Sequence, residues 1–145
     1  ELSNGPELKV LDFAADADDF AQFTVSFPKS WNEGVIKFQV FYTVTGTNTG
    51  TTAWGLRGAS MADNYDINHS DGFGAIANCA AKAHSGTSND INVTGLSGDL
   101  TIRGAAVDTV TFLEIHKDTS ASGQTGASRL IGIKLLYTLD GVNDA

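Results

Sequence analysis

Residues 35–44 read Val35-Ile36-Lys37-Phe38-Gln39-Val40-Phe41-Tyr42-Thr43-Val44, in which apolar side chains recur at every second position. Successive side chains of a β-strand point to opposite faces, so this period of two predicts a strand with one buried face. The expected buried face comprises Ile36, Phe38, Val40, Tyr42 and Val44. The opposite face carries the polar Lys37, Gln39 and Thr43.

Other segments repeat this pattern. One apolar stripe comprises Ile131, Ile133, Leu135, Tyr137 and Leu139, and another comprises Ala21, Phe23, Val25 and Phe27. In 107–117 the period slips between Phe112 and Leu113, which indicates either a bulge or a strand buried on both faces. Shorter candidate strands are Leu8–Phe13, Ala53–Met61, Ile91–Thr94 and Asp99–Arg103. About eight short strands separated by Gly-, Asn- and Ser-rich turns predict an all-β antiparallel sandwich of jelly-roll type.

One stretch fits the strand pattern less well. Residues 72–83 are rich in alanine, the strongest helix former, but Gly72 and Gly74 weaken a helix start. The sequence leaves a short helix and a strand equally open there.

Length and charge limit the classes of protein further. The chain has 145 residues, one cysteine and a net charge of −8. We expect a single domain at 9–145 preceded by an arm at 1–8, with no break in composition between them. Scattered basic residues predict no nucleic-acid partner, and the lack of a long apolar run predicts no membrane segment. Cys79, in an apolar stretch, is interpreted as a small buried side chain.

No residue pattern points to catalysis or to a metal. Asp12, Asp16, Asp18 and Asp19 crowd one loop, which we interpret as an acidic turn, with a hard-cation site as the alternative. In 63–72 the EF-hand pattern fails, because Asp71 stands where glycine is needed. His69, His84 and His116 have no metal-ligand spacing. We therefore expect no enzyme activity, no cofactor and no metal.

The two tryptophans have a structural and a functional interpretation. Trp31 lies in a loop between Pro28 and Gly34, and Trp54 begins a strand. Core packing is the simpler interpretation and the one we predict for Trp31. Stacking on a sugar or packing against a partner chain is the alternative.

Three segments together resemble a family of tailed-phage virion structural proteins. They are Phe27-Pro28-Lys29-Ser30-Trp31-Asn32-Glu33-Gly34, Ala53-Trp54-Gly55-Leu56-Arg57-Gly58 and Arg129-Leu130-Ile131-Gly132-Ile133-Lys134-Leu135-Leu136-Tyr137-Thr138. Members are jelly-roll domains of capsid decoration proteins and of head or tail fibres and spikes. The resemblance covers roughly residues 8–138 and supplies no catalytic residues. It implies a virion-surface protein, made in the host bacterial cytoplasm and usually trimeric.

Two roles follow from this resemblance. The first is a trimeric capsid decoration (cement) protein that binds the major capsid protein and stabilises the head shell. Its expected interface residues are Glu1, Leu2, Pro6, Phe41, Val110 and Leu136. The second is the receptor-binding head domain of a tail fibre or tail spike, bound to a host-surface glycan. Its expected carbohydrate contacts are Trp31, Tyr65, Asp66 and Asp71.

Overall fold

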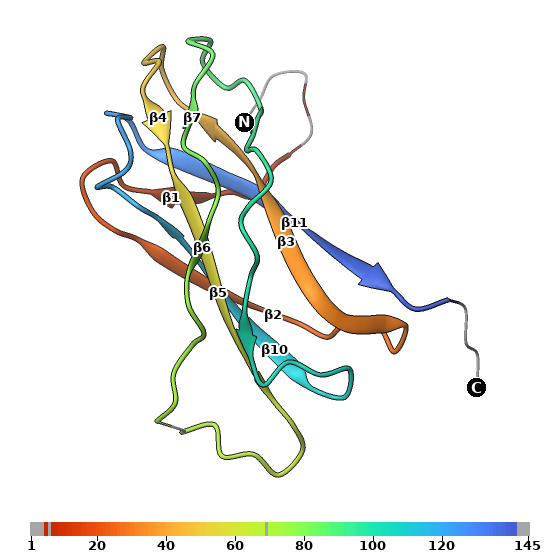
Figure 1. The fold of residues 1–145 in the computed structure, drawn as a ribbon. Coiled ribbons are helices and arrows are strands. Elements are labelled where there is room, and N and C mark those ends of the chain that lie inside the picture. The colour runs from red at the N-terminus through yellow and green to blue at the C-terminus, as the bar shows by residue number, and fades with distance from the viewer. Residues whose placement is uncertain (1–4, 6, 69, 142–145) are drawn as a thin grey trace.

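The computed structural model describes Gly5 and residues 7–68 and 70–141 of the chain. Three of the expected interface residues, Glu1, Leu2 and Pro6, lie outside this described part. All regular secondary structure in it is β-strand, as the sequence predicted (Figure 1). No helix that could cross a membrane occurs among these residues.

The described residues contain eleven strands, and four of them are long. The long strands are β3 (Trp31–Val44), β5 (Trp54–Met61), β10 (Val110–Lys117) and β11 (Ser128–Leu139). The others are β1 (Leu11–Phe13), β2 (Phe20–Val25), β4 (Thr51–Thr52), β6 (Ala77–Asn78), β7 (Lys82–Ala83), β8 (Asn92–Val93) and β9 (Ile102–Arg103).

The strands build two larger sheets that share one core. The first sheet has the order β1-β11-β3-β8, and the second has the order β2-β10-β5-β6, with β9 added parallel to β5. A small third sheet pairs β4 with β7. Buried side chains from both larger sheets form a single cluster, which gives the sandwich-like packing seen in Figure 1.

The pairing is nested along the chain. The first strand, β1, pairs with the last, β11, while β2 pairs with β10. Inside these pairs, β3 pairs with β8, and β5 pairs with β6. All four pairs are antiparallel, so the chain is a long hairpin whose two arms are wound over both sheets.

The core confirms the period of two in β3. Phe38, Val40, Tyr42 and Val44 are fully buried, and Ile36 is nearly so. From the facing sheet, Trp54 is fully buried and its ring centroid lies 5.8 Å from that of Tyr42. Burying large apolar side chains is the main stabilising contribution to a sheet packing of this kind.

Two expectations need correction. The helix alternative for 72–83 is wrong, because Gly74 N donates to Gly58 O (2.9 Å) and Cys79 N donates to Trp54 O (3.0 Å), so the segment is held extended beside β5. In β11 the register shifts between Leu130 and Gly132. This bulge places Leu130, instead of Ile131, on the buried side.

The period slip in β10 has a simple explanation. β10 pairs with β2 on one side and β5 on the other without a register shift. Leu113 and Ile115 point into the core, while Glu114 and His116 on the opposite face are also buried. Of the two alternatives for this segment, burial on both faces is therefore confirmed.

Trp31 is a core residue at one end of the two sheets. Its side chain is 4% exposed, and its ring centroid lies 4.5 Å from that of Phe27. Phe27 also meets Tyr137 edge-on, with centroids 5.5 Å apart. These three aromatic residues close the end of the core where β3 begins and β11 finishes.

We expect Trp31→Ala to lower the free energy of unfolding by about 3–5 kcal/mol, the usual cost of deleting a buried tryptophan. Equilibrium denaturation measures this change. Val35→Ala, at a 55% exposed position of the same strand, is the matched control and should cost well under half as much. An unchanged midpoint for Trp31→Ala would contradict the structural role.

Candidate functional site

Residues of the loop that links β5 to β6 form a cluster with Arg103 of β9. Arg103 Nε donates to Gly72 O (2.7 Å), and Arg103 Nη1 donates to the hydroxyl of Tyr65 (3.1 Å). Asp71 Oδ2 lies 3.7 Å from the same Nη1. Gly72 has a φ of +64°, a backbone conformation that glycine adopts without strain. Tyr65 and Asp71, two of the expected carbohydrate contacts, are thus brought together.

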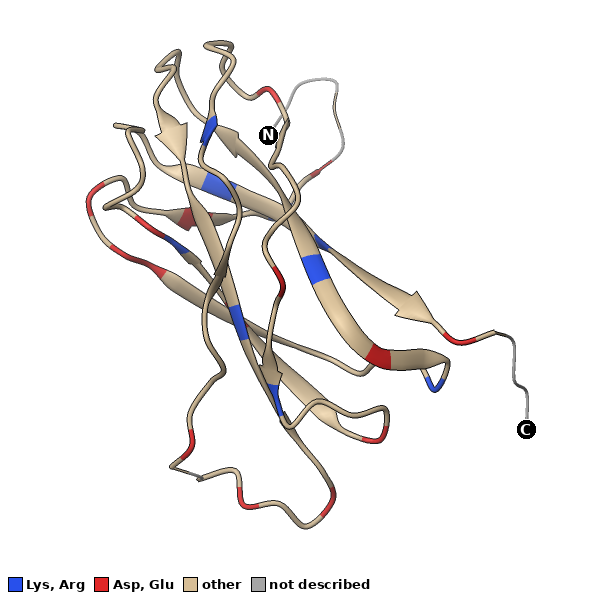
Figure 2. Ribbon diagram, in the orientation of Figure 1, with Lys and Arg blue, Asp and Glu red and all other residues tan. Residues whose placement is uncertain are grey.

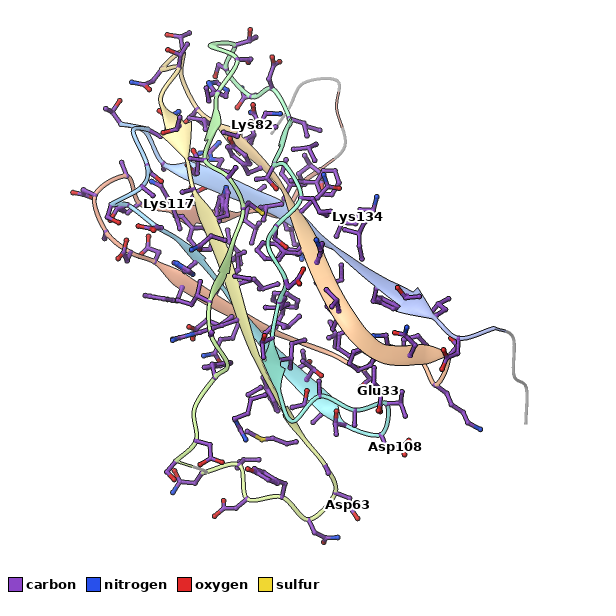
Figure 3. The ribbon with its side chains drawn as sticks, viewed as in Figure 1. Glu33, Asp63, Lys82, Asp108, Lys117 and Lys134 are labelled. Carbon is purple, nitrogen blue, oxygen red and sulfur yellow. The ribbon has the colours of Figure 1, made fainter. Side chains whose placement is uncertain are left out.

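A hollow of about 310 Å³ lies beside this cluster. It is lined by Gln22, Ala59, Met61, Ile67, Gly72, Phe73, Arg103 and Phe112. Asp66 is exposed and accepts a hydrogen bond from Asn68 N (2.8 Å) within its own turn. Asp63 lies at the far tip of the loop (Figure 3). Phe73 and Phe112 line this hollow together with Arg103, and such a combination of aromatic and charged side chains could bind a sugar ring.

Trp31 does not belong to this surface. It is buried in the core, and only 4% of it is exposed. The structure therefore removes Trp31 from the four expected carbohydrate contacts, because its ring faces are already covered by the core.

The outer face of the second sheet carries a polar network that sequence reasoning missed. Arg57 Nε donates to Glu114 Oε1 (2.7 Å), and Gln22 Nε2 donates to Glu114 Oε2 (2.8 Å). The Arg57 guanidinium also lies over the rings of Phe73 (5.0 Å) and Phe20 (5.9 Å). These residues are far apart in the sequence, and only the pairing of β2, β10 and β5 aligns them.

His116 extends the same face. Its ring stacks on Phe20 with centroids 5.6 Å apart and lies directly over Gly55, where a Cβ would meet the ring. Burial lowers the pKa of His116, although the nearby Asp118 and Asp18 oppose this shift. The neutral form is therefore favoured in the folded protein.

The acidic loop before β2 is organised around a lysine. Lys117 is fully buried, and its ammonium donates to Ala14 O (2.6 Å). Burial lowers the pKa of Lys117, while Asp19, Asp16 and Asp18 raise it. The acidic loop therefore surrounds the ammonium group of Lys117.

The individual aspartates of this loop also have partners. Asp18 accepts hydrogen bonds from the hydroxyl and the amide of Thr119, which lower its pKa. Asp19 accepts from Ala14 N (2.5 Å), and Asp12 pairs with Arg129 Nε (2.9 Å). In the described part of the chain, no group of three or more histidine, cysteine, aspartate or glutamate side chains is placed to hold a metal ion.

Cys79 is buried, as expected, and burial raises the pKa of its thiol. Thr94 Oγ1 lies 3.3 Å from its sulfur. His84 is also buried, and its Nδ1 lies 3.0 Å from Asn48 O. Both side chains lie within the packing of the strands.

The described interface candidates do not form one patch. Phe41 and Leu136 are half-buried on the outer face of the first sheet, because each alternates with inward-facing neighbours. Val110 is 39% exposed on the outer face of the second sheet. The two faces are on opposite sides of the molecule, so a single flat contact cannot use all three residues.

Acidic residues are concentrated in the loops at the ends of the strands (Figure 2). Comparisons with protein-family models, with curated proteins and with solved structures found no match to this chain.

Lys117→Met should lower the free energy of unfolding by about 2 kcal/mol, because a charge-assisted hydrogen bond to a buried carbonyl is lost. Chemical denaturation followed by circular dichroism provides the measurement. Lys134→Met, at an exposed position also labelled in Figure 3, is the control and should change stability by less than about 0.5 kcal/mol. Equal effects in the two variants would show that the loop does not depend on the Lys117 ammonium.

The free energy of unfolding should fall between about pH 7.5 and pH 5.5, because the unfolded chain, whose histidines titrate near 6.5, binds protons more readily than folded His116. His116→Gln, which stays neutral, should flatten this part of the stability profile. Urea midpoints measured at several pH values for the two proteins test the difference. Parallel profiles would exclude His116 as the source of the pH dependence.

Proposed function

We propose that this chain is a non-enzymatic structural protein of a tailed-phage virion and, most specifically, a trimeric capsid decoration protein with a jelly-roll fold. The observation that carries the proposal is the strand order. A jelly roll has eight strands in two sheets and is common in viral coats. Eight strands of this chain, β1, β2, β3, β5, β6, β8, β10 and β11, pair as first with last, second with seventh, third with sixth and fourth with fifth.

The virion part of the proposal also draws on the sequence resemblance described above. The three segments that carry the resemblance are Phe27–Gly34, Ala53–Gly58 and Arg129–Thr138. In the fold they contribute Trp31 and Trp54 to the core and supply most of β11. They are structural motifs, so a shared assembly role is what they support.

A decoration protein stabilises a shell by mass action. It binds the assembled lattice better than free subunits, so each bound copy shifts the equilibrium towards the closed shell. Linking three weak contacts in one trimer raises the effective concentration for the second and third. The net charge of −8 favours solubility and disfavours non-specific association at high copy number.

A second candidate function is glycan binding by the head domain of a tail fibre or spike. The favouring observation is the hollow of about 310 Å³ beside Arg103, Tyr65 and Asp71. Jelly rolls also serve as lectin domains. Copy number separates the two roles: quantitative mass spectrometry of purified particles should find hundreds of copies of a decoration protein but only tens or fewer of a fibre.

Particles that lack the protein should release their DNA at a lower temperature, or after milder osmotic shock, than complete particles. Their adsorption to host cells should be unchanged, because the proposed contact is with the shell. A fluorescent DNA-binding dye reports release during heating, and a plaque assay of unadsorbed particles reports adsorption. Intact heads combined with lost adsorption would instead favour the fibre role and the Arg103 cluster.

A further inference from the structure

The first sheet has an open edge along most of its outermost long strand. β1 has three residues and pairs only with Ser128–Leu130 of β11. From Gly132 onward, β11 continues to Leu139 and pairs with β3 on one side alone, as far as the described residues show. Figure 1 shows β11 running on past the short β1. The bulge at Ile131 marks the point where β1 no longer accompanies it.

This edge leaves core-facing side chains partly uncovered. Ile133 and Leu135 point inward from β11 and pack on the core but are only half-buried. Their partners across the pairing, Val40 and Phe38, are fully buried. The difference arises because β3 has a neighbour on each side and this part of β11 has one.

The second sheet has its own open edge on the same side of the molecule. Among the residues that the structure describes, β2 pairs only with β10, and its inward-facing Ala21, Phe23 and Val25 are half-buried. A groove of about 400 Å³ lies between the two edges and is lined by Lys9, Val10, Leu11, Phe23 and residues 130–133. One side of the packing is therefore a mainly apolar opening flanked by one free strand edge from each sheet.

The edges carry few of the features that normally keep free strands apart. Natural edge strands are protected by charged side chains, proline or bulges. Residues 20–27 contain no charged residue and no proline, and β2 pairs with β10 without a register shift. Residues 130–139 contain one charge, that of Lys134, and the register of β11 shifts only near the two ends of its free edge, at Leu130/Gly132 and Tyr137/Leu139. Lys134 is exposed and pairs in register with Gln39 on the outer face, away from the groove. Continuous sheet formation with another strand is the physical outcome that such edges favour.

The charge distribution favours a second copy of this chain as the occupant. The chain has 17 acidic residues, yet neither edge segment contains one. Two copies repel each other over most of their surface but can meet along these edges without burying a carboxylate. Both edges offer free backbone donors and acceptors together with apolar side chains at alternate positions.

We propose that the free edge of β11 in one copy pairs with the free edge of β2 in the next copy, and that three such head-to-tail contacts close a ring. The proposal rests on the trimer of the proposed function and gives it an interface. A heterologous contact closes when the rotation between copies is a third of a turn. Because the two edges flank one opening, the opening of each copy would face the three-fold axis of the ring. Phe23 and Ile133 would lie near this axis.

The first test measures mass in solution by light scattering at about 100 µM, where trimer formation predicts about three times the monomer mass of 15.2 kDa. Ile133→Lys and Phe23→Lys each place a charge in the opening and should convert the trimer to monomer. Phe41→Lys, on the outer face, is the matched control and should remain trimeric. Circular dichroism and thermal unfolding establish that each variant is folded.

The second test needs no variant. Hydrogen exchange of the unaltered protein should slow in the peptides covering residues 20–25 and 132–137 when the protein is concentrated enough to assemble. The peptides covering β5 should exchange equally at both concentrations, because β5 is paired on both sides. This comparison remains informative if a lysine variant fails to fold.

Four results would overturn the inference. A monomer at the highest concentration, or a dimer, excludes the three-fold ring. A trimer that Phe41→Lys dissociates and Ile133→Lys does not places the contact on a sheet face. A trimer whose edge peptides exchange as fast as in the dilute protein also excludes the strand edges as the contact. None of these results bears on whether the protein is found in virions, which the copy-number measurement decides separately.

Discussion

The antiparallel pairing of β3 with β11 is the constraint on which the rest of this fold depends. It joins residues 31–44 to residues 128–139, which lie in opposite halves of the chain. It places the pair of β1 with β11 beside the pair of β3 with β8, so two nested pairs form one sheet. Trp54 of the second sheet packs against the inward-facing side chains of β3, including Tyr42.

Period-two alternation was sufficient to predict β3, because that strand is long and its buried face is strongly apolar. It could not predict where β1 begins, since Leu8 and Val10 are apolar at alternate positions although the strand starts at Leu11. The Ala-rich segment was ambiguous for a related reason. Its extended form depends on hydrogen bonds to Gly58 and Trp54, partners that only the tertiary fold supplies.

The candidate sites were less predictable than the strands. The acidic residues were visible in the sequence, but their cations were not: Lys117, Arg103 and Arg57 each come from a distant strand. The alternation of polar and apolar residues does not distinguish Lys117 from an exposed lysine. In the structure its Nζ donates a hydrogen bond to Ala14 O inside the loop of aspartates. Charge pairing across a sheet depends on register, which single-strand patterns do not contain.

The surface through which copies of this chain can associate also depends on strand pairing. The outward-facing apolar residues Phe41 and Val110 pointed to the sheet faces as interfaces, but they lie on opposite sides of the molecule. The opening between β11 and β2 has backbone groups and core-facing side chains exposed together. Backbone hydrogen bonds add directional contacts to apolar burial, so this edge constrains the geometry of association more closely than either face does.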